Sequence, residues 1–275
     1  MQFFLKKYFK LKENNTNVSR EIIAGLTSFL AMSYIMVVNP LILSEAGMNF
    51  GAVFVATCLS AALGSLIMGL LANYPVGLAP GMGQNAFFTY AVVIGSGQPW
   101  QTALGAVFLS GMLFLIISLL PIRAWLINSI PKNLKLGITA GIGFFLAFIA
   151  MKNAGVITTN SSTITALGDL FSFSAFMAII GFFAITAFAS NGFKSSVITV
   201  VLIISIISWL LGKTVFLGIA SKPPSIEPLF FQLDIKAALD ISMLSVILTM
   251  LLVDIFDTAG TLVGVATRGN LTDSS

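Results

Sequence analysis

The sequence has no histidine, a single cysteine and few charged residues. Without histidine there is no imidazole to relay protons or to bind a metal. The lone cysteine, Cys58, cannot form an internal disulfide and says little about the redox compartment. One cysteine and scattered carboxylates also leave no spacing that is typical of a metal site. The residues therefore favour neither a metal site nor a bound cofactor.

Charged residues make up 9% of the chain and hydrophobic residues 57%, with a mean hydropathy of +1.00. An ordinary soluble domain has about 25% charged residues, and a soluble fold could not cover this much apolar surface. The net charge is +4, but the basic residues lie in short links between apolar runs, so no nucleic-acid partner is expected. The composition predicts an all-α polytopic membrane protein that works in a lipid bilayer.

A spanning helix needs about 20 mostly apolar residues. The first apolar run is uncharged from Ile22 to Leu43, longer than the about 7–15 residues of a signal-peptide core, so we interpret it as a retained span. With the N-terminus in the cytoplasm, ten Lys and Arg residues lie inside and four outside, which the positive-inside rule favours. We expect a multi-pass protein of the cell (inner or plasma) membrane. Both of its ends should lie in the cytoplasm. The eight predicted spans are roughly 21–43, 51–73, 76–95, 101–121, 134–151, 173–190, 196–217 and 240–267.

The third of these segments is interrupted. Residues 75–88 contain two prolines and three glycines, and such a break is tolerated in a membrane only against protein or a water-filled cavity. We expect a half-helix that begins near Gln84 or Asn85, the arrangement that marks binding sites in transporters. A simple Gly/Pro kink in a packed helix is the alternative. Residues 81–86 also match the letters of a dinucleotide fingerprint, but no strand precedes them.

The eighth segment carries two acids in its middle. Asp254 and Asp257 are three residues apart and share a helix face. Thr258 lies four residues after Asp254, and Thr261 lies four residues after Asp257. A carboxylate in mid-membrane costs about 2.5–3.5 kcal/mol, so two are hard to explain as incidental. Burial and mutual repulsion disfavour the ionised form. The stripe therefore suits proton coupling or hydrogen bonding to a polar ligand, the alternative being acids wetted at a helix end.

These segments resemble the nucleobase–cation symporter-2 (xanthine/uracil permease) family, in its AzgA-like branch of hypoxanthine, guanine and adenine permeases. The resemblance covers most of the chain, and the motifs of the third and eighth spans are specific. The matching stretches are GLTSFLAMSYIMVVNPLILSEAGM (25–48), VFVATCLSAALGSLIMGLLANYPVGLAPGMGQNAFF (53–88), WQTALGAVFLSGMLFL (100–115), INSIPKNLKLGITAGIGFFLAFI (127–149) and VDIFDTAGTLVGVA (253–266).

The resemblance implies a fold of fourteen spans in two inverted repeats of seven, with core and gate domains. This chain would hold the first repeat and span eight, and it is expected to be truncated after that span. A homodimer is one assembly that the full-length form could adopt. The implied organisation is a cytoplasmic tail 1–20, core spans one to four in 21–122, gate spans five to seven in 123–218, an extracellular linker 219–239, span eight in 240–268 and a cytoplasmic tail 269–275.

The resemblance also implies roles for individual residues. Asp254 would face the substrate and Asp257 would carry the coupling proton, with sodium as the alternative coupling ion. The other expected substrate-binding residues are Asn85, Phe87, Thr27, Ser28 and Thr258.

Three functional hypotheses follow. The first is proton-coupled purine uptake by an elevator-like movement of core against gate. The second is a truncated, non-transporting structural half that needs the missing repeat. The third, a membrane-embedded hydrolase that uses both acids, is disfavoured because intramembrane aspartyl sites draw their acids from separate helices. We therefore expect no enzyme activity.

Overall fold

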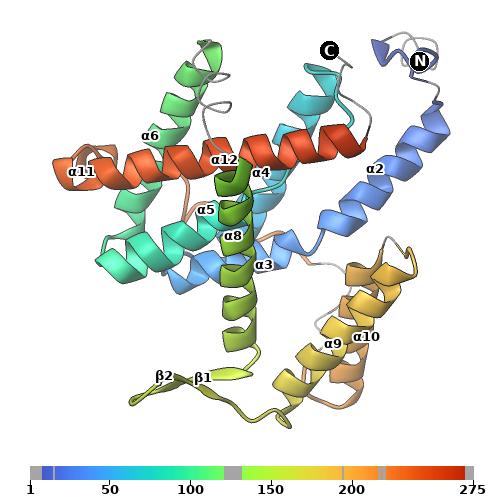
Figure 1. Ribbon diagram of the computed structural model, residues 1–275, viewed down its shortest axis with the longest axis vertical. Coiled ribbons are helices and arrows are strands. Elements are labelled where there is room, and N and C mark those ends of the chain that lie inside the picture. Colours follow the sequence, from blue (N-terminus) through green and yellow to red (C-terminus); the bar gives the residue numbers. More distant parts are fainter. Residues whose placement is uncertain are drawn as a thin grey trace. The chain divides into compact units, whose positions relative to one another are not determined.

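The structure is a computed structural model that describes residues 8–14, 16–120, 132–193, 195–215, 218 and 221–269. The predicted tails 1–20 and 269–275, the gate region 123–218 and the linker 219–239 lie partly outside these residues. Most of the described chain is helical (Figure 1). Its helices are α2 (Val18–Met32), α3 (Ile35–Glu45), α4 (Phe50–Leu70), α5 (Met82–Ala86), the π-helix η1 (Phe87–Gly95), α6 (Trp100–Leu119), α8 (Lys132–Asn153), α9 (Phe173–Ser190), α10 (Ser196–Leu210), α11 (Ile235–Ala238), the 3-10 helix η2 (Ile241–Met243) and α12 (Leu244–Arg268).

Within the described residues, five helical segments are long and apolar enough to cross a membrane. Each of them falls on one of the eight predicted spans. They are Val18–Glu45, Phe50–Leu70, Trp100–Leu119, Phe173–Ser190 and Ile241–Ala266.

Three predicted spans are shorter or broken. The third is interrupted, as described below. The fifth coincides with α8, whose described apolar part is Gly143–Asn153. The seventh was expected to reach residue 217, but α10 ends at Leu210. It ends there because Gly212 takes a positive φ of 66° and the Lys213 N–H donates to the Ser208 carbonyl at 2.8 Å, which terminates a helix.

The first predicted span, 21–43, is divided into α2 and α3 by a turn at residues 33 and 34. The Ser33 hydroxyl donates to the Leu30 carbonyl at 2.9 Å, and the Met36 N–H reaches the Ser33 carbonyl at 3.2 Å. These short-range bonds tighten the chain into one 3-10-like turn. α3 then contains Pro40, which has no N–H to give to the helix.

The expectation of an all-α protein is wrong in one place. Strands β1 (Ile157–Asn160) and β2 (Ile164–Leu167) pair antiparallel between α8 and α9. The segment is rich in isoleucine and threonine, which favour strands. The Asn160 side chain closes the turn by accepting from the N–H groups of Ser162 at 2.8 Å and Thr163 at 3.2 Å.

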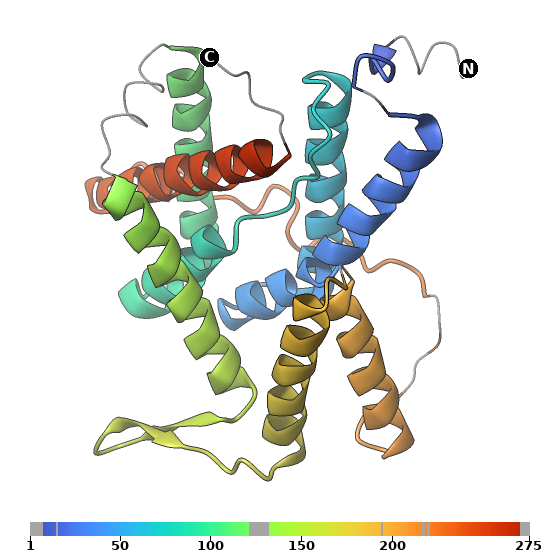
Figure 2. The same cartoon turned by 45° about the vertical axis from the view of Figure 1, so that its right-hand side comes forward.

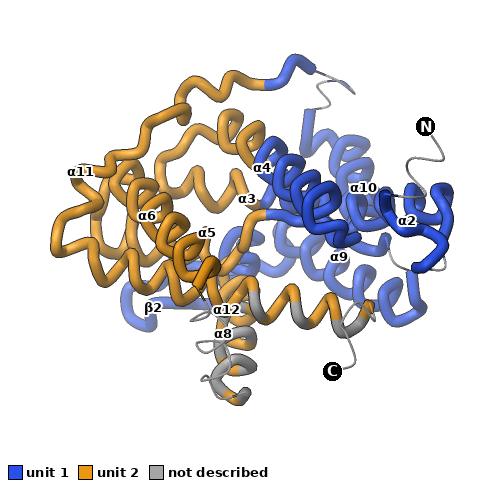
Figure 3. Tube along the Cα trace, turned by 90° about the horizontal axis from the view of Figure 1, so that it is seen from above, with its two compact units in different colours: residues 1–38, 58–79, 150–223 blue, residues 39–57, 80–149, 224–275 orange. Residues whose placement is uncertain are grey.

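The chain forms two compact units, each assembled from separate stretches of sequence (Figure 3). Unit 1 comprises 1–38, 58–79 and 150–223. In it α9 and α10 pack side by side (Figure 2), and α10 also contacts α2. Unit 2 comprises 39–57, 80–149 and 224–275, and it holds both the end of the interrupted span and α12.

The core of unit 2 lies where α6 meets η1, α11 and α12, with η2 packed on α12. Phe88 and Val92 of η1 are buried there beside Met243 and Met250. Burial of this kind contributes about 1.5–3 kcal/mol for each large apolar side chain. This packing holds η1, which contains Phe87, and α12, which contains Asp254 and Asp257, in one core.

Small residues allow α11 to approach α6 closely. The Asp234 N–H donates to the Gln101 carbonyl at 3.0 Å. A Cβ at Gly105 would overlap the Asp234 carbonyl oxygen and would lie 2.9 Å from Cβ of Ala238. We therefore expect Gly105→Ala to push α11 away and to lower the free energy of unfolding by about 1–3 kcal/mol, measured as a lower Tm in detergent. Gly111→Ala on the same helix meets no atom within 4 Å and should not lower the Tm; equal losses would contradict this packing.

Candidate functional site

The third predicted span is interrupted in the structure. Residues 73–81 are not helical, and α5 begins at Met82, slightly before the expected Gln84 or Asn85. Ser65 of α4 satisfies part of this irregular backbone, because its hydroxyl accepts from the Leu78 N–H at 2.9 Å and donates to the Leu78 carbonyl at 3.2 Å. Backbone that leaves a helix inside a membrane needs such substitute partners.

α5 continues directly into η1, which is a π-helix of nine residues. π-helical segments are rare and occur frequently at functional sites. Helix and π-helix together span Met82–Gly95, so the break divides the predicted span into an extended part and a helical part. The simple Gly/Pro kink does not describe this geometry, since residues 75–81 form no helix on the N-terminal side.

Asp257 of α12 lies against the break. A Cβ built at Gly81, the residue just before α5, would lie 2.8 Å from Oδ2 of Asp257. The carboxylate therefore occupies the space beside Gly81 that any other residue would fill with its side chain. α12 packs on α5, so this approach belongs to a continuous helix contact within unit 2. The structure brings one of the two predicted acids to the interrupted backbone.

The polar stripe of α12 is present as predicted from the spacing. Asp254, Asp257 and Thr258 are all partly buried, and Thr261 is exposed. The Thr258 hydroxyl donates to Oδ1 of Asp254 at 3.4 Å, whereas the Thr261 hydroxyl donates to the Asp257 backbone carbonyl at 2.6 Å. Thr258 thus supports the Asp254 carboxylate, and Thr261 leaves the Asp257 side chain to face Gly81.

Asn85 faces α3. Its Nδ2 donates to Oδ1 of Asn39, and Nδ2 of Asn39 donates to Oγ1 of Thr57 on α4 at 2.7 Å. One turn further along, the buried Thr89 hydroxyl donates to the Ile42 carbonyl of α3 at 3.2 Å. Asn85 is also held through its backbone N–H, which donates to the Gly81 carbonyl at 3.2 Å. The side of α5 and η1 that faces α3 is therefore polar at Asn85 and Thr89.

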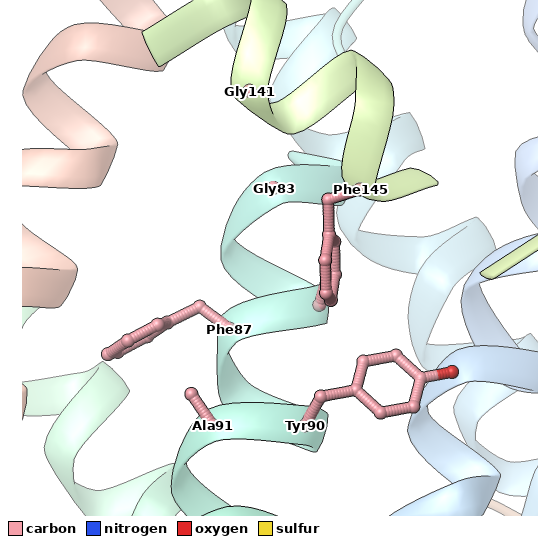
Figure 4. A pocket seen from close by; sticks show the side chains of 7 residues that line it. Gly83, Phe87, Tyr90, Ala91, Gly141 and Phe145 are labelled. Atoms are coloured by element: carbon pink, nitrogen blue, oxygen red, sulfur yellow. The ribbon is translucent and has the colours of Figure 1, made fainter. Parts of the chain in front are cut away.

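The other side of the same helix forms a pocket of about 380 Å³ (Figure 4). The pocket is apolar and largely aromatic, and α8 supplies its opposite wall. Phe145 of α8 makes an edge-to-face contact with Tyr90, with ring centroids 5.7 Å apart and an interplanar angle of 73°. The lining residues are Gly83, Ala86, Phe87, Tyr90, Ala91, Gly141 and Phe145.

Phe87 and Asn85 thus point in different directions. Successive residues of a helix turn by about 100°, so two residues apart lie on nearly opposite sides. Phe87 lines the pocket, whereas Asn85 bonds to Asn39. The sequence reasoning expected both to bind substrate. In the structure they lie on different sides of the helix, and their roles in binding stay predictions.

Thr27 and Ser28 lie on α2 in unit 1. The Thr27 hydroxyl donates to the Ile23 carbonyl of its own helix at 2.8 Å, and Ser28 is exposed. Their expected part in substrate binding stays a prediction.

Sequence reasoning missed Asn39, Thr57 and Phe145. Asn39 is the one polar side chain in the run from Ile35 to Leu43, and a polar side chain inside a span is a functional signal. That signal could have found Asn39. Phe145 had no such signal, because it is one of twenty-four phenylalanines.

The part of the chain that the structure describes contains no group of three or more Cys, Asp or Glu residues that could hold a metal ion. The described residues of this site supply two carboxylates, an amide, hydroxyl groups and aromatic rings.

Comparison with known proteins adds the family context. A family model described as "Permease family" matches residues 19–274. The chain is 43% identical to the adenine permease AdeP of Escherichia coli (strain K12) over 99% of its own length and 61% of that protein's length. It is 41% identical to the guanine/hypoxanthine permease PbuO of Bacillus subtilis (strain 168), over 96% of the chain and 62% of that protein. A putative permease of Methanocaldococcus jannaschii is 46% identical, over 98% and 62% respectively. The chain thus spans about three fifths of the length of these relatives.

Proposed function

Because the chain belongs to the permease family, we propose that the protein that contains it carries purine nucleobases across a membrane. It is a multi-pass membrane protein, as the apolar helices and the family together indicate, and a permease moves its substrate without converting it. The named relatives are an adenine permease and a guanine/hypoxanthine permease, which supports the substrate class.

The observation that carries the proposal is the approach of the Asp257 carboxylate to Gly81 at the break of the third span. An acid in the membrane is costly, and such residues mark ion and substrate pathways. Interrupted spans mark the same places in transporters. Here one acid and one interruption, far apart in the sequence, meet in one unit.

The pocket beside the break suits a flat heterocycle. Phe87, Tyr90 and Phe145 present aromatic surface, and Gly83 and Gly141 leave room beside it. Aromatic rings favour offset or edge-to-face contacts that are worth about 0.5–1.5 kcal/mol beyond the area that they bury. A planar purine can use such contacts through the face and edge of its ring.

Each polar residue then has a role. Asp254, supported by Thr258, accepts hydrogen bonds from purine N–H groups, for which a carboxylate is a strong acceptor. Asp257 takes up and releases the coupling proton, with sodium as the alternative ion. Asn85 offers an amide on the side of the helix turned away from the pocket, and Phe87 offers a ring inside the pocket. Thr27 and Ser28 stay predicted substrate-binding residues of α2.

Further features of the proposal concern the whole protein. They are a fourteen-span fold of two inverted repeats, elevator-like movement of core against gate, a cytoplasmic N-terminus in the cell membrane and a homodimer. The positive-inside count of ten against four Lys and Arg residues supports the orientation.

The test is uptake of radiolabelled adenine, guanine and hypoxanthine by cells that lack their own purine permeases and express the full reading frame containing these residues. We expect saturable uptake, and we expect Asp254→Asn to weaken both the rate and its pH dependence. Uptake that is indistinguishable in Asp254→Asn would remove this residue from the site. Absence of uptake by the unaltered protein would end the proposal.

The competing hypothesis is a structural half that does not transport alone. It is tested by expressing residues 1–275 without any further sequence. Uptake by this chain would rule that hypothesis out, whereas uptake only after co-expression with the C-terminal repeat of a relative would support it.

The aromatic wall yields a prediction with a neighbouring control. Phe145 lines the pocket, whereas the adjacent Phe144 is 78% exposed. We expect Phe145→Leu to raise the KM for purine uptake about five- to tenfold, since it loses the contact of an aromatic ring worth about 1 kcal/mol. Phe144→Leu should leave KM unchanged. The same KM in both variants would place the purine outside this pocket.

A further inference from the structure

A directional chain of buried hydrogen bonds lies behind the Asn85 side chain. It runs from Asn85 to Asn39, then to Thr57 and to the backbone of α4. The last bond is donated by the Thr57 hydroxyl to the Val53 carbonyl at 2.7 Å. Asn39 is 4% exposed and Thr57 is 2% exposed, so these groups depend on each other and not on bulk water.

The bond from Thr57 to Val53 sets the direction of the whole chain. A hydroxyl has one proton to donate, and that of Thr57 goes to Val53. Toward Asn39, Oγ1 of Thr57 is therefore an acceptor, so Asn39 must turn its NH₂ group to Thr57. The atom of Asn39 that faces α5 is then its carbonyl oxygen, and only the NH₂ group of Asn85 can answer it.

An asparagine amide has an acceptor end and a donor end, which a half-turn about χ2 exchanges. The chain of bonds determines which end of Asn85 is engaged by the protein. Because Nδ2 of Asn85 donates to Asn39, the carbonyl oxygen Oδ1 of Asn85 points away from Asn39. The second N–H of the same NH₂ group remains available to donate. A flipped amide would face Asn39 with oxygen against oxygen.

We propose that Asn39, oriented by Thr57, is a positioning residue that makes Asn85 present its carbonyl oxygen as an acceptor to the transported nucleobase. This inference rests on the proposed function and deepens it, because it assigns the polarity of the contact. Every purine nucleobase carries at least one ring N–H, which such an oxygen selects. A site that is built to pair one polar group rejects analogues that lack it.

Asn39 acts through Asn85, so the two residues should be energetically coupled. The first experiment is a double-mutant cycle of Asn39→Leu and Asn85→Ala in the full reading frame. Uptake of labelled adenine, guanine and hypoxanthine is measured as KM and as maximal rate per transporter in the membrane. We expect Asn39→Leu to raise KM about tenfold, the effect of one lost buried hydrogen bond that leaves its partner unsatisfied. In the Asn85→Ala background the same change should alter KM less than about twofold.

Thr57 provides a matched pair of milder variants. Thr57→Ser keeps the hydroxyl that orients Asn39, whereas Thr57→Val has nearly the same shape and removes it. Thr57→Val should raise KM and Thr57→Ser should not. This pair decides the question where Asn39→Leu fails to accumulate in the membrane.

Several outcomes would overturn the inference. Equal KM values for Thr57→Val and Thr57→Ser would do so, and so would additive effects in the Asn39–Asn85 cycle, because a purely structural residue affects folding independently of Asn85. If the unaltered protein takes up no purine, the proposed function falls, and the same cycle is then read from Tm in detergent. Additive Tm shifts would show that Asn39 does not orient Asn85; non-additive shifts would support the orientation itself.

Discussion

Replacing Asp257 by asparagine is expected to stop uphill purine uptake while purine exchange continues. Asparagine resembles the protonated aspartate in shape, but it cannot release a proton. One proton that crosses a potential of 100 mV supplies about 2.3 kcal/mol, which supports about a fiftyfold concentration ratio. In Asp257→Asn the ratio of internal to external purine should therefore fall from that order to about one.

The measurement uses membrane vesicles with an imposed proton gradient and labelled hypoxanthine. Accumulation reports coupling, and counterflow of labelled against unlabelled purine reports binding and movement without it. Asp169→Asn is the matched control, because Asp169 is exposed and its carboxylate accepts from the Phe171 N–H at 3.0 Å, which an asparagine oxygen also can. Intact accumulation in Asp257→Asn would contradict the coupling role. Accumulation by the unaltered protein that follows an imposed sodium gradient would show that sodium is the coupling ion.

The surroundings of the two acids explain why Asp257 is assigned the proton and Asp254 the purine. Thr258 donates to Oδ1 of Asp254, which orients that carboxylate, and a carboxylate has further lone pairs to accept from a purine N–H. Asp257 faces the bare backbone at Gly81. Asp254→Asn should therefore weaken counterflow together with accumulation, whereas Asp257→Asn should separate them.

The sequence predicted the features that depend on local pattern. Five of its eight spans coincide with apolar helices of the described chain, because the length of a span and its hydropathy follow directly from the bilayer. The break before Met82 was visible in its prolines and glycines. The stripe of Asp254, Asp257 and Thr258 followed from helix periodicity alone.

Contacts between distant residues could not be predicted in the same way. Asn85 and Asn39 are 46 residues apart in the sequence, and Asn39 and Thr57 are 18 apart. Their pairing depends on how α3, α4 and α5 pack, which no periodicity encodes. The turn of about 100° per helical residue predicts that Asn85 and Phe87 lie on different sides. This inference required knowing that both residues are helical.

Two local features were missed because the apolar composition outweighed weaker signals. The run of isoleucine and threonine around residues 157–165 favours strands, and it forms the hairpin of β1 and β2. Ser33 lies in a largely apolar run, where the chain turns between α2 and α3, and Pro40 follows inside α3. Both features are short, so their contribution to hydropathy over a whole span is small.

The second large effect is expected for Gly81→Ala. The backbone at Gly81 has φ −73° and ψ 116°, which any residue can adopt, so alanine adds no backbone strain. Its Cβ would lie 2.8 Å from Oδ2 of Asp257, closer than stable contacts allow. Overpacking of this kind costs about 1–3 kcal/mol, and we expect accumulation to fall about tenfold or more as the carboxylate moves away.

Gly111→Ala, which meets no atom within 4 Å, controls for loss of a glycine in a span and should transport normally. The steric origin is tested in a second background. If the carboxylate is what the new Cβ meets, Gly81→Ala should lower Tm in the unaltered protein and cost little when Asp257 is already alanine. Equal Tm losses in both backgrounds would mean that Gly81 is required for another reason. A single methyl group that lowers Tm only while Asp257 is present would tie the break in the third span to the acid of α12, the contact on which the proposed function depends.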